Sequence, residues 1–356
     1  MKRHNKKIKF ALLGYGHIGK RHADLIVQDP NAELTAIIDI DPFHQENALE
    51  FKVPLFTHLS EFLNSGILTD VVNICTPNGL HANQAIQCLE NHKHVIIEKP
   101  IALTKEEALK VQKTSIKYHK HAFPVVQNRY SPVIKWVKEI LEEQVLGEIF
   151  MVQLNCFWNR DERYYIPGSW HGSLNLDGGP LYTQFSHFID VLLWMFGDIT
   201  NINSKFLNFN HEYLTQFEDS GIISFDFKKQ GVGVLNYSTS VFGANFESSM
   251  TIIGAKGVIK IGGQYMNEIS YCNVDGLEIP SFDSTAPANN YGIYQGSAAN
   301  HQFLISNVIN VLNGIEAPHV ALEDGIRVVD TIERIYIGRT QNEKMEVTND
   351  GFTLYN

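Results

Sequence analysis

The sequence predicts an α/β protein with two parts, a doubly wound parallel sheet followed by an α+β part with one large, open, mainly antiparallel sheet. Over residues 1–126, short apolar strands alternate with helical patterns, which is typical of a parallel sheet covered by helices. Over residues 127–356, several strands follow one another without helices between them, which indicates an antiparallel sheet. We expect one domain in each range, and whether the C-terminal helices pack back on the first domain is left open.

The composition is that of a globular protein, with 356 residues, 44% of them hydrophobic and 19% charged, and a net charge of −10. This acidic balance argues against nucleic acid as a partner. We expect no membrane span, because no apolar run reaches about 18 residues, and no signal peptide after the basic start MKRHNKK. The four cysteines stand singly in apolar contexts. They predict reduced core residues, no metal site and a cytoplasmic location.

A dinucleotide-binding turn is predicted after the first strand, residues 8–13. The motif Gly14-Tyr15-Gly16-His17-Ile18-Gly19 follows this strand, and a helical pattern then runs to residue 26. The first glycine permits a tight turn, and the second lets a pyrophosphate approach the backbone, which places His17 and Ile18 beside it. The third lets helix and strand pack closely. This order of strand, glycine motif and helix indicates a Rossmann domain.

The second strand, residues 34–38, ends at Asp39 and Ile40. Asp39 follows Gly19 by 20 positions, the usual offset of the acid that binds the adenosine ribose. An acid there accepts hydrogen bonds from the 2′-hydroxyl and repels a 2′-phosphate, so the cofactor is predicted to be NAD rather than NADP. Alternatively, Asp39 caps the turn at Asp41-Pro42.

Three later strand ends are expected at the same rim of the sheet. The strand at 71–75 leads into Thr76, Pro77, Asn78 and His81, the strand at 94–97 into Glu98-Lys99-Pro100, and the strand at 123–126 into Gln127. The carboxyl ends of parallel strands line the ligand crevice of such sheets, so these residues are predicted to border the cofactor. Lys99 could donate to a substrate hydroxyl, with its pKa lowered by the cationic nicotinamide, or it could be a surface lysine.

One long helix is predicted from Pro180 to Phe196, after Asp177-Gly178-Gly179 and before a stop at Gly197. Its apolar residues form one stripe. Thr183, Gln184, His187 and Asp190 lie off this stripe at three- and four-residue spacings and are predicted to share a face. Asp190 could fix the tautomer of His187. Taken alone, the helix favours a packing histidine over a catalytic one.

The rest of the second half contains a helix from Pro132 and a long strand up to residue 158, then an irregular segment at 159–176. Strands are predicted at 221–227, 232–241, 248–253 and 258–261, a loop at 280–296, and helices at 303–312 and 326–337. An anionic substrate would need cations. The candidates for contacts with it are Arg129, Arg160, Arg163, Tyr164, Tyr165, Thr183 and Gln184, although each arginine could equally form a surface ion pair.

Together these motifs resemble the glucose–fructose oxidoreductase / inositol dehydrogenase / MocA family. The resemblance rests on Gly14-x-Gly16-x-x-Gly19-x-x-His22, on Thr76-Pro77-Asn78 with His81, on Glu98-Lys99-Pro100, and on Asp177-Gly178-Gly179 before His187 and Asp190. It implies a nicotinamide held between the two domains, with Lys99 and His187 facing the substrate and His187 the more usual base. It also implies Trp170 and His171 as cofactor contacts. With the glycine turn and Glu98-Lys99-Pro100 in the same sequence, a catalytic role for His187 is favoured over a packing role.

The run from Cys156 to Gly197 is also similar to the WlbA-type UDP-N-acetyl-2-amino-2-deoxyglucuronate dehydrogenases of bacterial surface-polysaccharide pathways. The resemblance implies NAD-dependent oxidation of the sugar C3 hydroxyl. Two positions depart from the family: Thr183 stands where much of it has aspartate, and His171 where an arginine is common. A sugar or polyol dehydrogenase and a non-catalytic NAD(P)-binding sensor are the alternatives. An uncovered face of the second sheet would make a homodimer or homotetramer interface.

Overall fold

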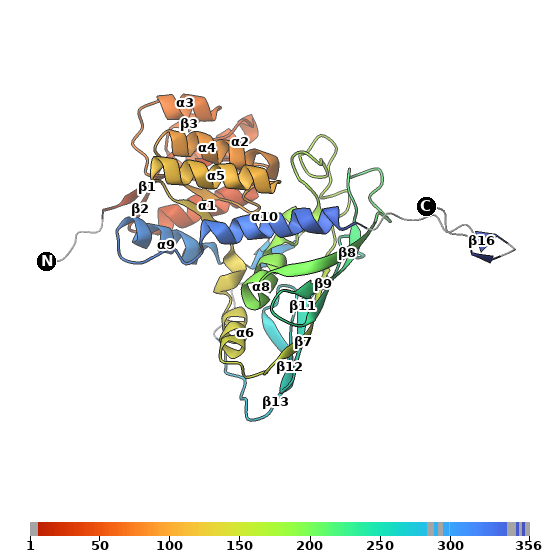
Figure 1. Ribbon diagram of the computed structural model, residues 1–356. Helices are drawn as coiled ribbons and strands as arrows, with labels where there is room; N and C mark the ends of the chain where they lie inside the picture. The colour runs from red at the N-terminus through yellow and green to blue at the C-terminus, as the bar shows by residue number, and fades with distance from the viewer. Residues whose placement is uncertain are drawn as a thin grey trace.

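The structure is a computed structural model that describes residues 6–282, 288–290, 295–298, 300–339, 347–348 and 351–352. It contains two large sheets, seen at the upper left and lower right of Figure 1, with helix α10 (Leu322–Ile337) running across both. Two short antiparallel pairs stand apart, β14 (Ala288–Asn290) with β15 (Gln295–Ala298) and β16 (Val347–Thr348) with β17 (Gly351–Phe352). Among the described residues, no helix combines the length and apolarity needed to cross a membrane.

The first sheet has six strands in the order β3-β2-β1-β4-β5-β6, all paired in parallel. Every residue of the central strand β4 is buried, because helices cover both faces, and this explains its unbroken apolar character. The chain order reverses between β1 and β4, so the ligand crevice opens at the carboxyl ends of these two strands. The six strands are Ile8–Leu13 (β1), Ala32–Ile38 (β2), Leu55–Phe56 (β3), Val71–Ile74 (β4), His94–Ile97 (β5) and Ala122–Pro124 (β6).

The helices of the first sheet include one from the far end of the chain, α9 (His301–Leu312). Its side chains Leu304, Ile305, Val308 and Ile309 join the same buried cluster as β1 and α1, and Figure 1 shows α9 beside α1. A C-terminal helix therefore completes the core of the first sheet. The other helices here are α1 (His17–Gln28), α2 (Pro42–Ala48), α3 (Leu59–Asn64), α4 (His81–Glu90) and α5 (Lys105–Tyr118).

The second sheet has seven strands in the order β13-β12-β11-β7-β10-β9-β8. Only β7 and β10 run parallel, and the other neighbours are antiparallel. Burial alternates along β9 and β10, so one face is packed, and α6 (Pro132–Glu142), α8 (Ser186–Phe196) and α10 lie on it in Figure 1. Its strands are Ile149–Phe157 (β7), Ile199–Leu207 (β8), Ser220–Phe227 (β9), Val232–Ser238 (β10), Glu247–Gly254 (β11), Gly257–Gly262 (β12) and Glu268–Val274 (β13).

The predicted fold class is confirmed, with differences in several elements. The sequence reading missed β3, α2 and α3, and also the edge strands β8 and β13, which carry mixed polar and apolar residues. The loop predicted at 280–296 lies partly outside the described residues, and part of it forms β14 and β15. The four cysteines are free thiols, as expected.

The helix predicted from Pro180 to Phe196 is in fact two helices, α7 (Pro180–Thr183) and α8 (Ser186–Phe196). The N–H groups of Gln184 and Phe185 both donate to the Pro180 carbonyl, each at 2.9 Å, so the first turn closes on itself. The carbonyl of Thr183 would accept from residue 187 in an unbroken helix. Here it accepts from Nζ of Lys99 instead. The break thus offers a backbone acceptor to the crevice.

Candidate active site

A cavity of about 1200 Å³ opens at the carboxyl ends of the first sheet and continues toward the break between α7 and α8. A pocket for one small ligand usually measures roughly 300–1000 Å³, so this cavity has room for a cofactor and a substrate together. The predicted site residues that line it are Gly14, Gly16, His17, Ile18, Asp39, Ile40, Thr76, Pro77, Asn78, His81, Glu98, Lys99, Gln127, Arg160, Tyr164, Trp170, His171, Thr183, Gln184 and His187.

The glycine turn has the geometry that a bound pyrophosphate requires. Gly14 has φ +91°, and a Cβ there would lie 2.7 Å from the Cys75 carbonyl oxygen. A Cβ on Gly19 would lie 2.0 Å from the Gly14 carbonyl oxygen, so helix α1 and the turn touch. A Cβ on Gly16 would meet nothing within 4 Å, which leaves open space at the start of α1. This space, next to the first N–H groups of the helix, fits a phosphate.

We predict opposite outcomes for alanine at two of these glycines. Gly16→Ala should leave the folded chain as stable as the wild type, because the added methyl meets open space, but should weaken NADH binding by about tenfold or more. Gly19→Ala should destabilise the chain by about 1–3 kcal/mol, because the methyl overlaps backbone. Thermal melting and NADH fluorescence titration distinguish the two effects. Normal NADH affinity in Gly16→Ala would contradict this assignment.

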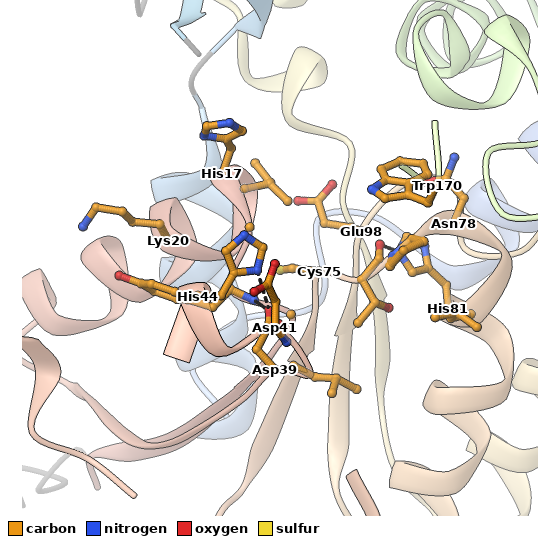
Figure 2. A pocket seen from close by; sticks show the side chains of 18 of the residues that line it. His17, Lys20, Asp39, Asp41, His44, Cys75, Asn78, His81, Glu98 and Trp170 are labelled. Carbon is orange, nitrogen blue, oxygen red and sulfur yellow. Dashed lines mark hydrogen bonds and ion pairs between the residues drawn. The ribbon is translucent and has the colours of Figure 1, made fainter. Parts of the chain in front are cut away.

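The far end of the turn is acidic. Oδ2 of Asp39 accepts from the Tyr15 N–H at 2.5 Å and lies 3.2 Å from Nδ1 of His44, while Oδ1 accepts from the Asp41 N–H at 2.8 Å. Asp39 therefore does cap the turn that begins at Asp41, and it also lines the cavity. Figure 2 shows Asp39, Asp41 and His44 together at this end, and Glu50 lines it as well. These carboxylates disfavour a 2′-phosphate.

Asn78, His81 and Trp170 form the opposite end of the view in Figure 2, with Glu98 and Cys75 between the two ends. The two ring nitrogens of His81 lie 2.7 Å from the carbonyl oxygens of Pro100 and Thr76. His81 thus ties two of the strand-end loops together. Trp170 stacks on His171 with ring centroids 3.9 Å apart, and burial lowers the pKa of His171 to about 3.

Glu98 is buried and surrounded by groups from distant parts of the chain. Its Oε1 lies 2.9 Å from Nε2 of His22 and 3.5 Å from Nε2 of His301. Burial alone would raise the pKa of Glu98, but these histidines outweigh it and hold that pKa well below its usual range. These groups lie within 4.8 Å of one another, and Nδ2 of Asn73 lies 3.0 Å from Nδ1 of His22. Sequence reasoning missed His301, which follows Glu98 by about 200 positions and carries no local motif.

Lys99 and His187 face the same end of the cavity. Burial lowers the pKa of Lys99 to about 8, although Glu98 and Asp177 act to raise it. Burial, and secondarily Lys99, hold the pKa of His187 well below its usual value. Nε2 of His187 lies 3.2 Å from Nε2 of Gln127, in the short turn η3 (Gln127–Tyr130). A neutral imidazole and an easily deprotonated amine can both exchange a proton with a hydroxyl.

Arg129 does not reach the cavity, which corrects the expectation that it contacts the substrate. Its Nε and Nη2 donate to Asp190 at 2.8 and 2.6 Å, and its Nη1 donates to Asp324 at 3.0 Å. The expectation that Asp190 fixes the tautomer of His187 is therefore also wrong, because Asp190 faces Arg129. Instead, this buried pair joins η3, which carries Gln127, to α8, which carries His187.

The irregular segment sends only some of its predicted residues into the cavity. Arg163 pairs with Asp161 at 2.6 Å on the surface, and Tyr165 is buried beside Phe217, so neither lines the cavity. The guanidinium of Arg160 lies 4.9 Å from the ring of Trp158 and 5.1 Å from that of Tyr164. Trp158 also lines the cavity. It was not among the predicted site residues, because it lies at the end of a predicted strand.

The open glycine turn, the acid at its far end and the lysine–histidine pair beyond them fit an NAD-dependent oxidoreductase acting on CH–OH groups. Two family models match the chain: the oxidoreductase family with an NAD-binding Rossmann fold over residues 8–125, and the GFO/IDH/MocA C-terminal domain over residues 134–260. The chain belongs to this family, and its cofactor is NAD.

Solved structures and curated proteins both include similar dehydrogenases. The WlbA dehydrogenase from Bordetella pertussis, in complex with NADH and UDP-GlcNAcA, has TM-score 0.84 and 29% identity over 94% of this chain and 96% of its own. The WlbA dehydrogenase from Chromobacterium violaceum, with the same ligands, has TM-score 0.84 and 30% identity over 94% of each chain. The glucose-6-phosphate 3-dehydrogenase of Bacillus subtilis is 24% identical over 96% of this chain and 99% of its own.

Proposed function

We propose that the chain oxidises the C3 hydroxyl of a nucleotide sugar, UDP-N-acetyl-2-amino-2-deoxyglucuronate, in bacterial surface-polysaccharide biosynthesis. The observation that carries this proposal is the size and lining of the cavity, which extends past the cofactor crevice to Lys99, His187 and Arg160. A uronate with a diphosphate is a large anionic substrate, and Arg160 supplies a cation where it would lie. The WlbA complexes with NADH and UDP-GlcNAcA support the same choice.

In this proposal Lys99 removes the hydroxyl proton. A bound NAD would supply the acceptor for the hydride of the sugar carbon. The pKa of Lys99, about 8, is close to a working pH, and the cationic nicotinamide would lower it further. His187 has a far lower pKa, so it stays neutral and is the poorer base. This assigns to His187 the positioning of the hydroxyl, the reverse of the role that the family resemblance implied.

Arg160 provides the test of the substrate class. We expect Arg160→Met to raise KM for UDP-GlcNAcA by about tenfold or more, because a charged hydrogen-bonded contact contributes roughly 1.5–3 kcal/mol, and to leave NADH affinity unchanged. NADH production is measured with UDP-GlcNAcA, UDP-GlcNAc, glucose 6-phosphate, glucose and inositol. Arg163→Met is the matched control, because Arg163 lies outside the cavity.

Each alternative function has its own result in this panel. Turnover of glucose 6-phosphate or inositol without preference for UDP-sugars would favour a sugar or polyol dehydrogenase, which the Bacillus subtilis relative makes a specific second candidate. NAD binding without turnover of any sugar would favour a sensor.

We also propose that the uncovered face of the second sheet forms the interface of a homodimer or homotetramer. The strand register places Met151, Ile222, Val232 and Tyr271 on this face, and each is at least 43% exposed. Exposed apolar side chains that gather on one sheet face are typical of an interface.

A further inference from the structure

Asp177 is a fully buried carboxylate behind the wall of the cavity. Its Oδ2 accepts from the Gly172 N–H at 2.9 Å, and its Oδ1 accepts from the hydroxyl of Thr183. Burial raises the pKa of Asp177, while Thr183, the neighbouring N–H groups and Lys99 act to lower it. Since both carboxylate oxygens accept hydrogen bonds, the contacts suit the ionised form.

Thr183 connects this carboxylate to both sides of the crevice. Nδ2 of Asn78, from the first sheet, donates to the Thr183 hydroxyl at 2.7 Å, so that hydroxyl has its single proton left for Asp177. The backbone carbonyl of the same residue accepts from Nζ of Lys99. One residue therefore hydrogen-bonds the proposed base through its carbonyl and a buried carboxylate through its side chain.

We propose that Asp177 is a positioning residue of the active site, which holds Lys99 in place through Thr183 and tunes its proton affinity with a buried negative charge. This rests on the proposed role of Lys99 as the base. The side chain at position 183 is a neutral hydroxyl, and Asp177 supplies a carboxylate one hydrogen bond further from the cavity. Without that charge, burial would make Lys99 a weaker base.

Several charged groups surround Lys99, and Asp177 is the one that is joined to it by hydrogen bonds through Thr183. Glu98 and Asp177 stabilise the ammonium form, and Arg160 opposes it. Three histidines also face Lys99: His81, His171 and His187. Burial lowers the pKa of each, although the two carbonyl contacts of His81 act to raise its pKa. Glu98 is committed to His22 and His301.

The test measures the titration of Lys99 directly, without turnover. The full-length chain is labelled with trace acetic anhydride across a pH series, and acetylation of Lys99 is followed by mass spectrometry, with the exposed Lys117 as an internal control. In Asp177→Asn, the midpoint for Lys99 should fall below the wild-type value of about 8, by about half a unit or more. Thr183→Val should shift it the same way by less, and Thr183→Ser should keep the wild-type midpoint.

Each result separates this inference from the proposed function. If the midpoint is unchanged in both Asp177→Asn and Thr183→Val, Asp177 has only a structural role and the inference is overturned. If Asp177→Asn does not fold, Thr183→Val and Thr183→Ser decide: equal midpoints in these two overturn the inference, and a lower one in Thr183→Val alone supports it. Shifted midpoints in a chain that turns over no UDP-sugar would uphold the inference and reject the proposed substrate.

Discussion

Lys99→Met is expected to lower kcat by about 10²–10⁴-fold, the usual contribution of a general base, while NADH still binds. Methionine keeps most of the length of the side chain but cannot accept the hydroxyl proton. In the wild type, kcat/KM should rise with pH and level off above the pKa of Lys99, which is about 8 in the free chain and lower with NAD bound, because Lys99 must lose its proton before it can act as a base. The variant should lose this rise. The measurements are a pH series of NADH formation and a fluorescence titration with NADH.

His187→Gln is the companion variant. Glutamine can still donate a hydrogen bond to the substrate hydroxyl, so a positioning role for His187 predicts a smaller loss of kcat than in Lys99→Met and an unchanged pH midpoint. If His187→Gln is the more damaging change and removes the pH dependence, the roles of the two residues are exchanged. Wild-type kcat in both variants would reject the assignment of the site.

Asp190→Ala is expected to lower the free energy of unfolding by about 3–5 kcal/mol, because it leaves the guanidinium of Arg129 buried without its bidentate partner. Burial raises the pKa of Asp190 and Arg129 lowers it, so ion pairing is what offsets burial of this carboxylate. Urea denaturation measures the loss. The same variant should reduce kcat, because the pair joins the turn that carries Gln127 to the helix that carries His187.

Asp324→Ala is the matched control, since Asp324 contacts the same guanidinium at 3.0 Å from a side chain that is 21% exposed. Water can replace part of that interaction, so the loss should be clearly smaller, about 1 kcal/mol. Equal losses of unfolding free energy in the two variants would mean that the burial of Asp190 does not strengthen its ion pair with Arg129.

The residues at the cofactor end of the site could be predicted because they lie in consecutive elements with a characteristic spacing. The interval from Gly14 to Asp39 contains one turn, one helix and one strand, and the strand-end position of Lys99 placed it at the same rim. The fold class followed from the same alternation of elements. These patterns depend on backbone geometry, which short segments specify.

The other half of the site depends on contacts between distant segments. Arg129 and Asp190 both stand beside predicted site residues, but nothing in their spacing shows that they bind each other. The break at Gln184 and Phe185 has no glycine or proline to mark it, and the apolar stripe continues across it. The pairing of His301 with Glu98 needs the whole second half of the chain in place.

The return of α9 to the first sheet has a consequence for synthesis of the chain. When residues 1–126 have emerged from the ribosome, all six strands of that sheet have been synthesised. The residues of α9 that cover the apolar surface beside β1 and α1, Leu304, Ile305 and Val308, have not. The core of the nucleotide-binding half is therefore completed only after most of the polypeptide has emerged, and that surface stays exposed until then. The two halves are consecutive along the chain but mature together.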